Sequence, residues 1–275
     1  MTTPKVNTIK RGDARFYVNP ETAAKYPGVT SVVGMLPKGF LQYWSAKKVA
    51  EAAVDELGTI VQMTLRDRQA AIDHLKGAPR RDTAQAAETG TAAHDLFERL
   101  ARGENVGRVH PDLVLYVDHF KEFLDLKQPE FLFMEETVWS DSHRYAGSFD
   151  WCARIDGEVV WGDNKTTRSG IHEEVGIQLS AYRYADHILR PDGSRVPMPK
   201  ADGAAVFHVR PEGWKLVPVR ADEEVFEVFK HLRAVFEWER ELKATIIGQT
   251  IAYGPSDAPA PTGPKRTVAR ARKAT

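Results

Sequence analysis

The sequence predicts a mixed α/β (α+β) protein, and three observations lead to this class. Apolar residues recur at three- and four-residue spacing through most of the first half, which is typical of amphipathic helices. Between residues 130 and 166 they run instead in short blocks rich in β-branched and aromatic residues, which is typical of strands. Helical and strand patterns alternate after that, with too few strands for a barrel.

The first half opens with an extended arm, around Asn7–Asn19, that turns at residues 12 and 13, Gly-Asp. Four helices are expected next, over Leu41–Leu57, Ile60–Leu75, Thr83–Arg102 and Asp112–Lys127. The second half begins with three strands, over Glu130–Trp139, Gly147–Ile155 and Glu158–Thr166. A helix near Ile171–Leu189, a hairpin of Ala204–Arg210 with Trp214–Arg220, and a helix over residues 222–245 complete the prediction.

Composition excludes several protein classes. Of 275 residues, 42% are apolar and 28% charged, so disordered and collagen-like chains are excluded. No stretch approaches the roughly 18 apolar residues of a membrane helix, and no signal-peptide pattern follows Met1, so a cytoplasmic protein without a membrane partner is expected. The single cysteine, Cys152, excludes internal disulfides and an iron–sulfur cluster held by this chain alone.

Charge is distributed unevenly along the chain. The 38 basic and 38 acidic residues give no net charge, which by itself argues against a nucleic-acid partner. Residues 254–275, however, hold five basic residues against one acidic residue, a net charge of +4, which leaves −4 on residues 1–253. We expect a single domain over residues 1–253, followed by a disordered basic tail that attracts phosphate or merely aids solubility.

The most informative segment is a predicted hairpin with residues 156–157, Asp-Gly, as its turn. Both central positions of a type I′ turn need positive φ, which this dipeptide tolerates. Such a turn pairs Ile155 with Glu158 and, further out, Asp150 with Asp163. The last pair falls on a site without ladder hydrogen bonds, where the Cα atoms are about 4.5 Å apart.

Two carboxylates in this arrangement repel each other unless something binds them. A Mg²⁺ or Mn²⁺ ion held by Asp150 and Asp163 would remove the repulsion, and Lys165, on the face of Asp163, would offset charge on a phosphate. The alternative is an exposed hairpin face on which Lys165 neutralises both acids. Residues 159–161, Val-Val-Trp, argue for a buried strand, where bare charges are costly.

Flanking helices add polar residues. His94 shares a helix face with Gly90 and Phe97, so it is expected to point inward, either as a hydrogen-bonded core residue or as a metal ligand. Gln178 and Tyr182 lie one turn apart on the helix after the hairpin and can act from one face.

Four motifs follow one another in a fixed order: residues 90–94, Gly-Thr-Ala-Ala-His; 147–150, Gly-Ser-Phe-Asp; 163–166, Asp-Asn-Lys-Thr; and 178–182, Gln-Leu-Ser-Ala-Tyr. This set resembles the PD-(D/E)XK nuclease superfamily, in particular its RecB-type and phage recombination exonuclease branch. The resemblance spans about residues 85–190 and extends loosely to residues 27–33. It implies a restriction-endonuclease-like core, with a central mixed sheet flanked by helices and a helical N-terminal part.

The resemblance assigns roles to individual residues. Asp150 and Asp163 would bind the metal, one or two Mg²⁺ or Mn²⁺ ions, and the backbone carbonyl of Asn164 would be a further ligand. Lys165 would orient the attacking water or stabilise the phosphate. His94 would be an extra metal ligand or a phosphate contact.

Other residues would support this centre. Gln178 and Tyr182 would hold Lys165 and the DNA backbone in place. An acid of the preceding strand, Glu135 or Glu136, often joins such sites; adjacent residues face opposite ways, and we favour Glu135. Candidate DNA contacts are Thr91, Lys47, Lys48 and Trp44, with Arg66, Arg68, Arg80 and Arg81 as further basic residues or as an ordinary solvated face.

Two departures narrow the resemblance. Asp163 stands where Glu is commoner, and the four cysteines of the iron–sulfur subgroup are missing. No P-loop pattern of a helicase is present, so any ATP-driven motor that works with this protein would be another protein.

The function that the resemblance implies is a metal-dependent deoxyribonuclease, an exonuclease acting from DNA ends in recombination, repair or genome processing. Its partners would be linear duplex or single-stranded ends and a single-strand annealing or single-strand-binding protein; the sequence leaves homo-oligomerisation open. The alternatives are a structure-specific endonuclease or nickase of the same fold, and a non-catalytic DNA-binding protein on a nuclease scaffold. The helical part would span residues 20–128 and the catalytic core residues 83–220.

Overall fold

The computed structural model describes residues 5–251; the predicted basic tail and the predicted boundary at residue 253 lie outside them. The chain divides into two compact units, residues 1–236 and 237–275. The described part of the second unit contains a π-helical turn, Trp238–Leu242, and a 3-10 turn, Lys243–Thr245. All three described sheets belong to the first unit. Within residues 5–251, no helix has the length and apolar character needed to cross a membrane.

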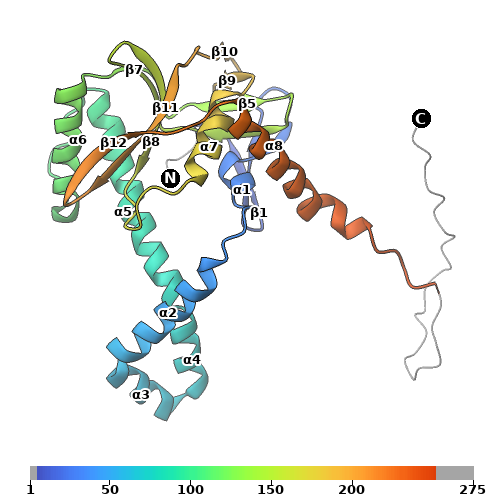
Figure 1. The fold of residues 1–275 in the computed structure, drawn as a ribbon. Coiled ribbons are helices and arrows are strands. Elements are labelled where there is room, and N and C mark those ends of the chain that lie inside the picture. The colour runs from blue at the N-terminus through green and yellow to red at the C-terminus, as the bar shows by residue number, and fades with distance from the viewer. Residues whose placement is uncertain (1–4, 252–275) are drawn as a thin grey trace. The chain divides into compact units, whose positions relative to one another are not determined.

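A five-stranded sheet lies at the centre of the first unit (Figure 1). The strand order is β12 (Gly213–Pro218), β11 (Gly203–Arg210), β8 (Glu158–Lys165), β7 (Trp151–Ile155) and β4 (Glu130–Met134). Neighbours are antiparallel except β8 and β11, which are parallel, and the connection between these two passes through helix α7 (Glu174–Arg183). The mixed α/β class predicted from the sequence is therefore confirmed.

Helices cover both faces of this sheet because its side chains alternate between two hydrophobic clusters. On one face Trp151 packs with Phe97 of helix α5 (Ala78–Ala101) and Phe120 of helix α6 (Val114–Lys127). Phe97 and Phe120 stack with ring centroids 4.5 Å apart, which joins α5 to α6, and Phe97 meets Phe207 of β11 edge-on at 6.1 Å, which holds the C-terminal half of α5 against the sheet.

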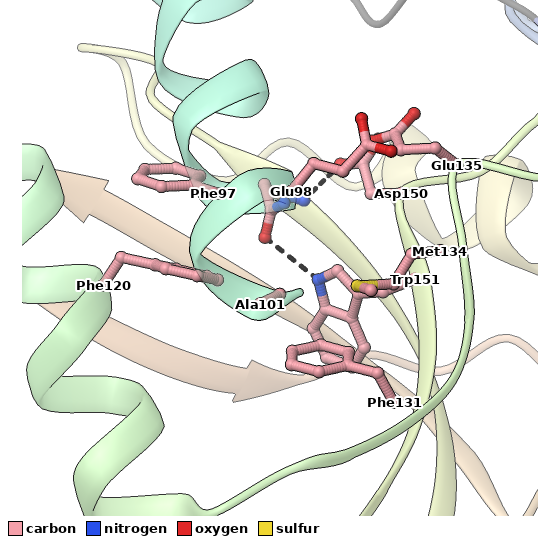
Figure 2. A pocket seen from close by; sticks show the side chains of 10 residues that line it. Phe97, Glu98, Ala101, Phe120, Phe131, Met134, Glu135, Asp150 and Trp151 are labelled. Carbon is pink, nitrogen blue, oxygen red and sulfur yellow. Dashed lines mark hydrogen bonds between the residues drawn. The ribbon is translucent and has the colours of Figure 1, made fainter. Parts of the chain in front are cut away.

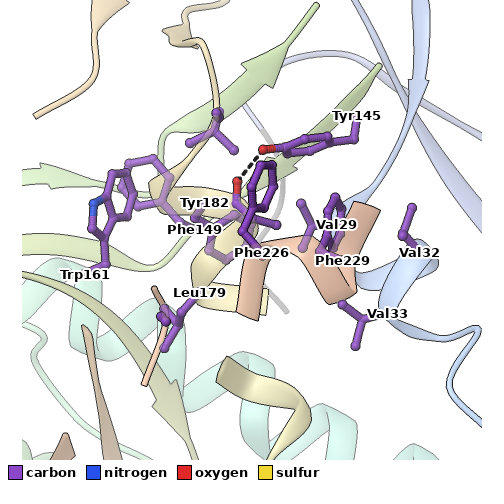
Figure 3. Close-up of a cluster of buried hydrophobic side chains, with 14 of the residues drawn as sticks. Val29, Val32, Val33, Tyr145, Phe149, Trp161, Leu179, Tyr182, Phe226 and Phe229 are labelled. Carbon is purple, nitrogen blue, oxygen red and sulfur yellow. Dashed lines mark hydrogen bonds between the residues drawn. The ribbon is translucent and has the colours of Figure 1, made fainter. Parts of the chain in front are cut away.

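On the opposite face Trp161 packs with Leu179 of α7 and Phe229 of helix α8 (Glu223–Glu237), in the cluster drawn in Figure 3. The short helix α1 (Val29–Val33) contributes three buried valines to the same cluster. The strand β8 is thus covered from both sides, as its apolar sequence predicts.

Two smaller antiparallel sheets complete the first unit. One has the order β10 (Arg195–Pro197), β9 (His187–Leu189), β5 (Thr137–Ser140) and β6 (Tyr145–Ser148). The other consists of β1 (Thr8–Arg11), β2 (Ala14–Val18) and β3 (Lys25–Pro27). The first two strands of this N-terminal sheet are the predicted extended arm, and Gly12 has the positive φ that its turn needs.

The remaining helices form what we call the helical arm, α2 (Phe40–Asp55), α3 (Leu57–Arg66) and α4 (Arg68–Lys76). These helices pack on one another and on α5, on the side away from the central sheet in Figure 1. No residue of α2 or α3 is buried, and α4 buries only Ala71.

The predicted hairpin register is confirmed as far as Trp151 and Gly162, whereas the predicted pair of Asp150 with Asp163 lies beyond the end of the ladder. Ile155 pairs with Glu158, and the ladder continues outward to the pair of Trp151 with Gly162. Both turn residues have positive φ, +51° for Asp156 and +90° for Gly157, as a type I′ turn requires.

Two predicted strands were wrong in one respect, since each is broken into two. The segment Glu130–Trp139 separates into β4 and β5, which belong to different sheets, because Glu135 has a φ of +53° that no strand can continue through. The segment Gly147–Ile155 separates in the same way into β6 and β7, with residues 149 and 150 between them.

Two predicted helices also differ from the structure. The segment Ile60–Leu75 is two helices, because Asp67 is extended and its carboxylate accepts hydrogen bonds from the N–H groups of Gln69 and Ala70 at 2.8 and 3.2 Å. The helix predicted to reach Leu189 ends at Arg183, and residues 187–189 pair with β5 and β10 instead.

Candidate metal centre

The candidate centre lies where the chain passes twice between the two larger sheets. Glu135 follows β4 and Asp150 precedes β7, and the two crossings are bonded to each other. The N–H of Glu135 donates to the carbonyl of Asp150 at 2.9 Å, and the N–H of Phe149 donates to the carbonyl of Glu136 at 3.2 Å. The two strand breaks therefore bring two acidic residues, distant in sequence, to one point.

Helix α5 adds a histidine to these acids. His94, Glu135 and Asp150 each offer one ligand atom, and these atoms all lie within 4.8 Å of one another. His94 is 9% exposed and Glu135 5% exposed, so the group sits below the surface. His94 Nδ1 lies 3.4 Å from Asp150 Oδ2, and this buried nitrogen has no hydrogen-bond partner among residues 5–251.

The donor set fits a divalent metal ion. A buried nitrogen without a hydrogen bond is costly unless another group occupies its lone pair, and a metal ion would do so. Two carboxylates favour hard cations such as Mg²⁺ and Mn²⁺, whereas an imidazole also suits Zn²⁺ or Fe²⁺. The residues accommodate a metal but do not single out one element.

A second polar group adjoins this triad on β8 and α7. The ammonium of Lys165 lies 2.6 Å from Asp163 Oδ2, and the side-chain amide of Gln178 donates to Asp163 Oδ1 at 2.8 Å. The same amide nitrogen donates to the hydroxyl of Tyr182 at 3.3 Å, one helical turn further on. Asp163 is 3% exposed, so its charge depends on these partners.

Burial and neighbouring charges together set the pKa values of this group. Burial raises the pKa of Asp163, against the ammonium of Lys165, and the carboxylate of Asp150 raises it further. Burial acts to lower the pKa of Lys165, but Asp163 and Asp150 outweigh it and the pKa is raised. Burial acts to raise the pKa of Asp150, but His94, Lys165 and the N–H of Asn164 outweigh it and the pKa is lowered.

The predicted metal ligands are thus divided between the two groups. His94, Asp150 and the favoured acid Glu135 form the triad, whereas Asp163 is held by Lys165 and Gln178 beside it. Glu136, the other candidate acid, instead approaches Lys5, whose ammonium lies 4.0 Å from its carboxylate.

A small pocket opens beside the triad (Figure 2). Its polar wall contains Glu135 and Asp150, and its other wall is formed by aromatic and apolar side chains of α5, α6 and β4. Two carboxylates of the triad, Glu135 and Asp150, therefore face a small space whose other side is mostly apolar.

Three of the four predicted DNA contacts lie in helix α2 of the helical arm, whereas Thr91 lies on α5 about one turn before His94. Lys48 is bound by Glu51 at 3.0 Å and Asp82 at 3.1 Å, and Asp82 precedes His94 by twelve helical residues, about 18 Å along α5. Lys47 lies 3.6 Å from Glu51. Thr91 donates its hydroxyl to the carbonyl of Ala87 in its own helix at 2.9 Å. Trp44 lies in α2 and is half-buried.

Sequence reasoning missed Trp151, whose indole N–H donates to Asn164 Oδ1 at 3.0 Å. The register supplied a signal, because it sets this large residue directly opposite Gly162. No protein-family model matches this chain, and no curated protein matches its sequence.

Proposed function

We propose that this chain is a metal-dependent deoxyribonuclease of the PD-(D/E)XK type that hydrolyses phosphodiester bonds from DNA ends. The observation that carries the proposal is the triad of His94, Glu135 and Asp150 beside the ion pair of Asp163 and Lys165. An ion site next to a buried ammonium suits a substrate that is a phosphate with developing negative charge.

The topology agrees with the proposal. Strands β4, β7 and β8 pair antiparallel, with β5 and β6 inserted between β4 and β7. Helix α7 follows, then β9 and β10, and β11 pairs parallel to β8. Apart from these inserted strands, the order of a helix, three strands, a helix and another strand is that of the core of the PD-(D/E)XK superfamily, which the four sequence motifs resemble. Of the four sequence motifs, residues 90–94 and 147–150 supply His94 and Asp150 to the triad. Residues 163–166 and 178–182 meet through the hydrogen bond of Gln178 with Asp163.

When bound, a divalent ion at the triad supplies Lewis-acid chemistry by polarising a phosphate oxygen and lowering the pKa of a water molecule. The net reaction joins the water oxygen to phosphorus and breaks one P–O ester bond. His94, Glu135 and Asp150 would hold the ion. Mg²⁺ and Mn²⁺ are the expected ions, one or two of them, and no iron–sulfur cluster is proposed.

Lys165 would act as a cation rather than as a base. Its pKa is raised by Asp163 and Asp150, so the side chain carries a proton at neutral pH. The protonated amine would donate to a phosphate oxygen as charge develops there. Gln178, bound to both Asp163 and Tyr182, would keep the ion pair oriented from α7.

The test is digestion of linear duplexes, labelled at the 5′ or the 3′ end, with Mg²⁺ or Mn²⁺ present. We expect progressive shortening from ends, and a fall of about a hundredfold or more for Lys165→Ala. Lys215→Ala, an exposed lysine on β12 of the same sheet, is the matched control and should keep full activity.

Closed circular DNA separates the alternatives. An obligate exonuclease leaves circles intact, so nicking of circles would favour a structure-specific endonuclease or nickase. DNA binding without cleavage under any divalent metal would favour the non-catalytic DNA-binding protein. Full activity of Asp163→Ala would refute the assignment.

A further inference from the structure

Asn164 is bound at two points by consecutive residues, Asp150 just before β7 and Trp151 at the start of β7. Its backbone N–H donates to Asp150 Oδ2 at 2.6 Å, and its side-chain oxygen accepts from the indole N–H of Trp151 at 3.0 Å (Figure 2). The same carboxylate oxygen of Asp150 lies 3.4 Å from His94 Nδ1. The position of Asn164 therefore bears directly on the orientation of a triad carboxylate.

These bonds take over where the regular ladder ends. The register of β7 with β8 runs only to the pair of Trp151 with Gly162. Beyond it, β8 carries Asp163, Asn164 and Lys165 toward the candidate site without further β7 pairs. On its other side this end of β8 is paired with β11, where Phe207 lies opposite Asn164. The two bonds of Asn164 hold it on the side that faces the triad.

The indole reaches Asn164 because the opposite strand has no side chain in its path. A Cβ atom on Gly162 would lie 2.0 Å from the Trp151 ring, so only glycine leaves space for it. Trp151 is 2% exposed and meets Phe131 edge-on with centroids 6.2 Å apart, so its orientation is fixed by packing. Asn164 is 5% exposed, and its amide oxygen depends on this donor.

We propose that Trp151 is a positioning residue for the metal centre: its indole N–H holds Asn164, whose backbone N–H holds the Asp150 carboxylate toward His94 and Glu135. This inference rests on the proposed function, because it assumes that the triad binds a metal ion. Partners that orient metal-binding carboxylates commonly change metal affinity about 10- to 100-fold when they are removed.

The protein contains its own matched control for a purely structural role. Trp161 is also fully buried, on the adjacent strand β8, but its indole nitrogen has no hydrogen-bond partner among residues 5–251. Trp161→Phe thus removes ring volume and a nitrogen that bonds to nothing. Trp151→Phe removes similar volume together with the bond to Asn164.

The experiment titrates the full chain with Mn²⁺ by isothermal calorimetry, well below the melting temperature of every variant. We expect Trp151→Phe to weaken Mn²⁺ binding about tenfold or more, and Trp161→Phe to leave it unchanged within twofold. Equal effects of the two substitutions, or none from Trp151→Phe, would overturn the positioning role while leaving the proposed function intact. A wild-type chain that binds no Mn²⁺, Mg²⁺ or Zn²⁺ would refute the proposed function and this inference together.

A double variant covers the case in which Trp151→Phe folds poorly. Trp151→Phe with Asn164→Leu leaves no buried amide oxygen without a donor, so stability should recover. Mn²⁺ affinity should stay low, because the Asn164 backbone is no longer anchored through its side chain. Recovery of wild-type affinity along with stability would show that the Trp151 bond is merely structural.

Discussion

The strand β8 and the helical arm differ in how far their apolar side chains are buried. Both Trp161 and Asp163 of β8 are less than 4% exposed, because helices cover both faces of the sheet there. The contacts of each side chain are therefore set by the residues packed against it. In α2 and α3 no residue is buried. Large apolar side chains of these two helices stand in solvent instead, namely Phe40, Leu41, Tyr43, Val54, Leu57, Val61 and Leu65.

This contrast teaches where the chain tolerates change. Around β8 the interior is closely packed, so an added methyl group or a lost charge must disturb a neighbour. The arm has few neighbours to disturb, so the same substitutions there should have little effect or the opposite sign. Three matched pairs of variants and one single variant of the arm test the contrast, from the largest expected effect to the smallest.

The largest difference should appear for Asp→Asn. Asp150→Asn removes a charge from the proposed metal ligands and should lower metal-dependent cleavage of labelled duplex by about a thousandfold. Asp55→Asn changes an exposed acid at the end of α2 and should leave the cleavage rate unchanged. Equal losses of cleavage rate from Asp150→Asn and Asp55→Asn would indicate that the loss is not specific to the triad.

Replacing glycine by alanine should lower stability at Gly162 of β8 and raise it at Gly58 of the helical arm. At Gly162 the new methyl group meets the Trp151 ring at 2.0 Å, and overpacking of this kind should lower the free energy of unfolding by about 3 kcal/mol. At Gly58, within α3, nothing lies within 4 Å, and the better helix propensity of alanine should raise that free energy by about 0.5 kcal/mol. Urea unfolding curves measure both changes, and a destabilised Gly58→Ala would mean that this position of the arm is covered.

Replacing leucine by alanine should likewise cost much stability at the buried Leu179 and little at the exposed Leu65. Leu179 is fully buried on α7, and its truncation should cost about 3 kcal/mol through lost burial and the cavity left behind. Leu65 is 83% exposed on α3, and its truncation should change stability by less than about 0.5 kcal/mol. A cost at Leu65 that rises with protein concentration would reveal association through the arm, which the monomer alone does not predict.

The smallest effect is expected from a lysine of the arm. Lys48 is bound by Glu51 and Asp82, whose hydrogen bonds raise its pKa, so its charge is already balanced. Lys48→Gln should therefore leave the slope of log affinity for DNA against log salt concentration nearly unchanged. A decrease of about 0.9, the value for one lost phosphate contact, would contradict this and support the predicted DNA-binding role.

Local sequence was informative where a few adjacent residues decide the conformation. The Asp156-Gly157 turn predicts its hairpin register correctly out to Trp151 and Gly162. The helical spacing of Gln178 and Tyr182 likewise predicts their contact. In both cases, backbone geometry alone fixes which side chains meet.

Among the predicted metal ligands, His94, Asp150 and Glu135 lie together, but strand pattern alone does not explain this grouping. Strand pairing brings Asp150 beside the end of β8, yet Asp163 is held by Lys165 and Gln178, and the other acid of the triad is Glu135. Glu135 itself has positive φ and lies at the break between β4 and β5, which belong to different sheets. The alternating apolar pattern of this segment gives no sign that the strand is broken there.

The sequence by itself determined the mixed α/β class, the hairpin and its register, and the inward face of His94, because these follow from local turn chemistry and periodicity. Only the tertiary structure decided that Glu135 lies against both His94 and Asp150, that Gln178 binds Asp163, and that Trp151 reaches Asn164 past Gly162. The first two contacts join residues of different elements, helix α5 with the two crossings between sheets and helix α7 with β8, and the third crosses between neighbouring strands of one sheet. Their positions depend on the packing of the whole first unit, which no local pattern encodes.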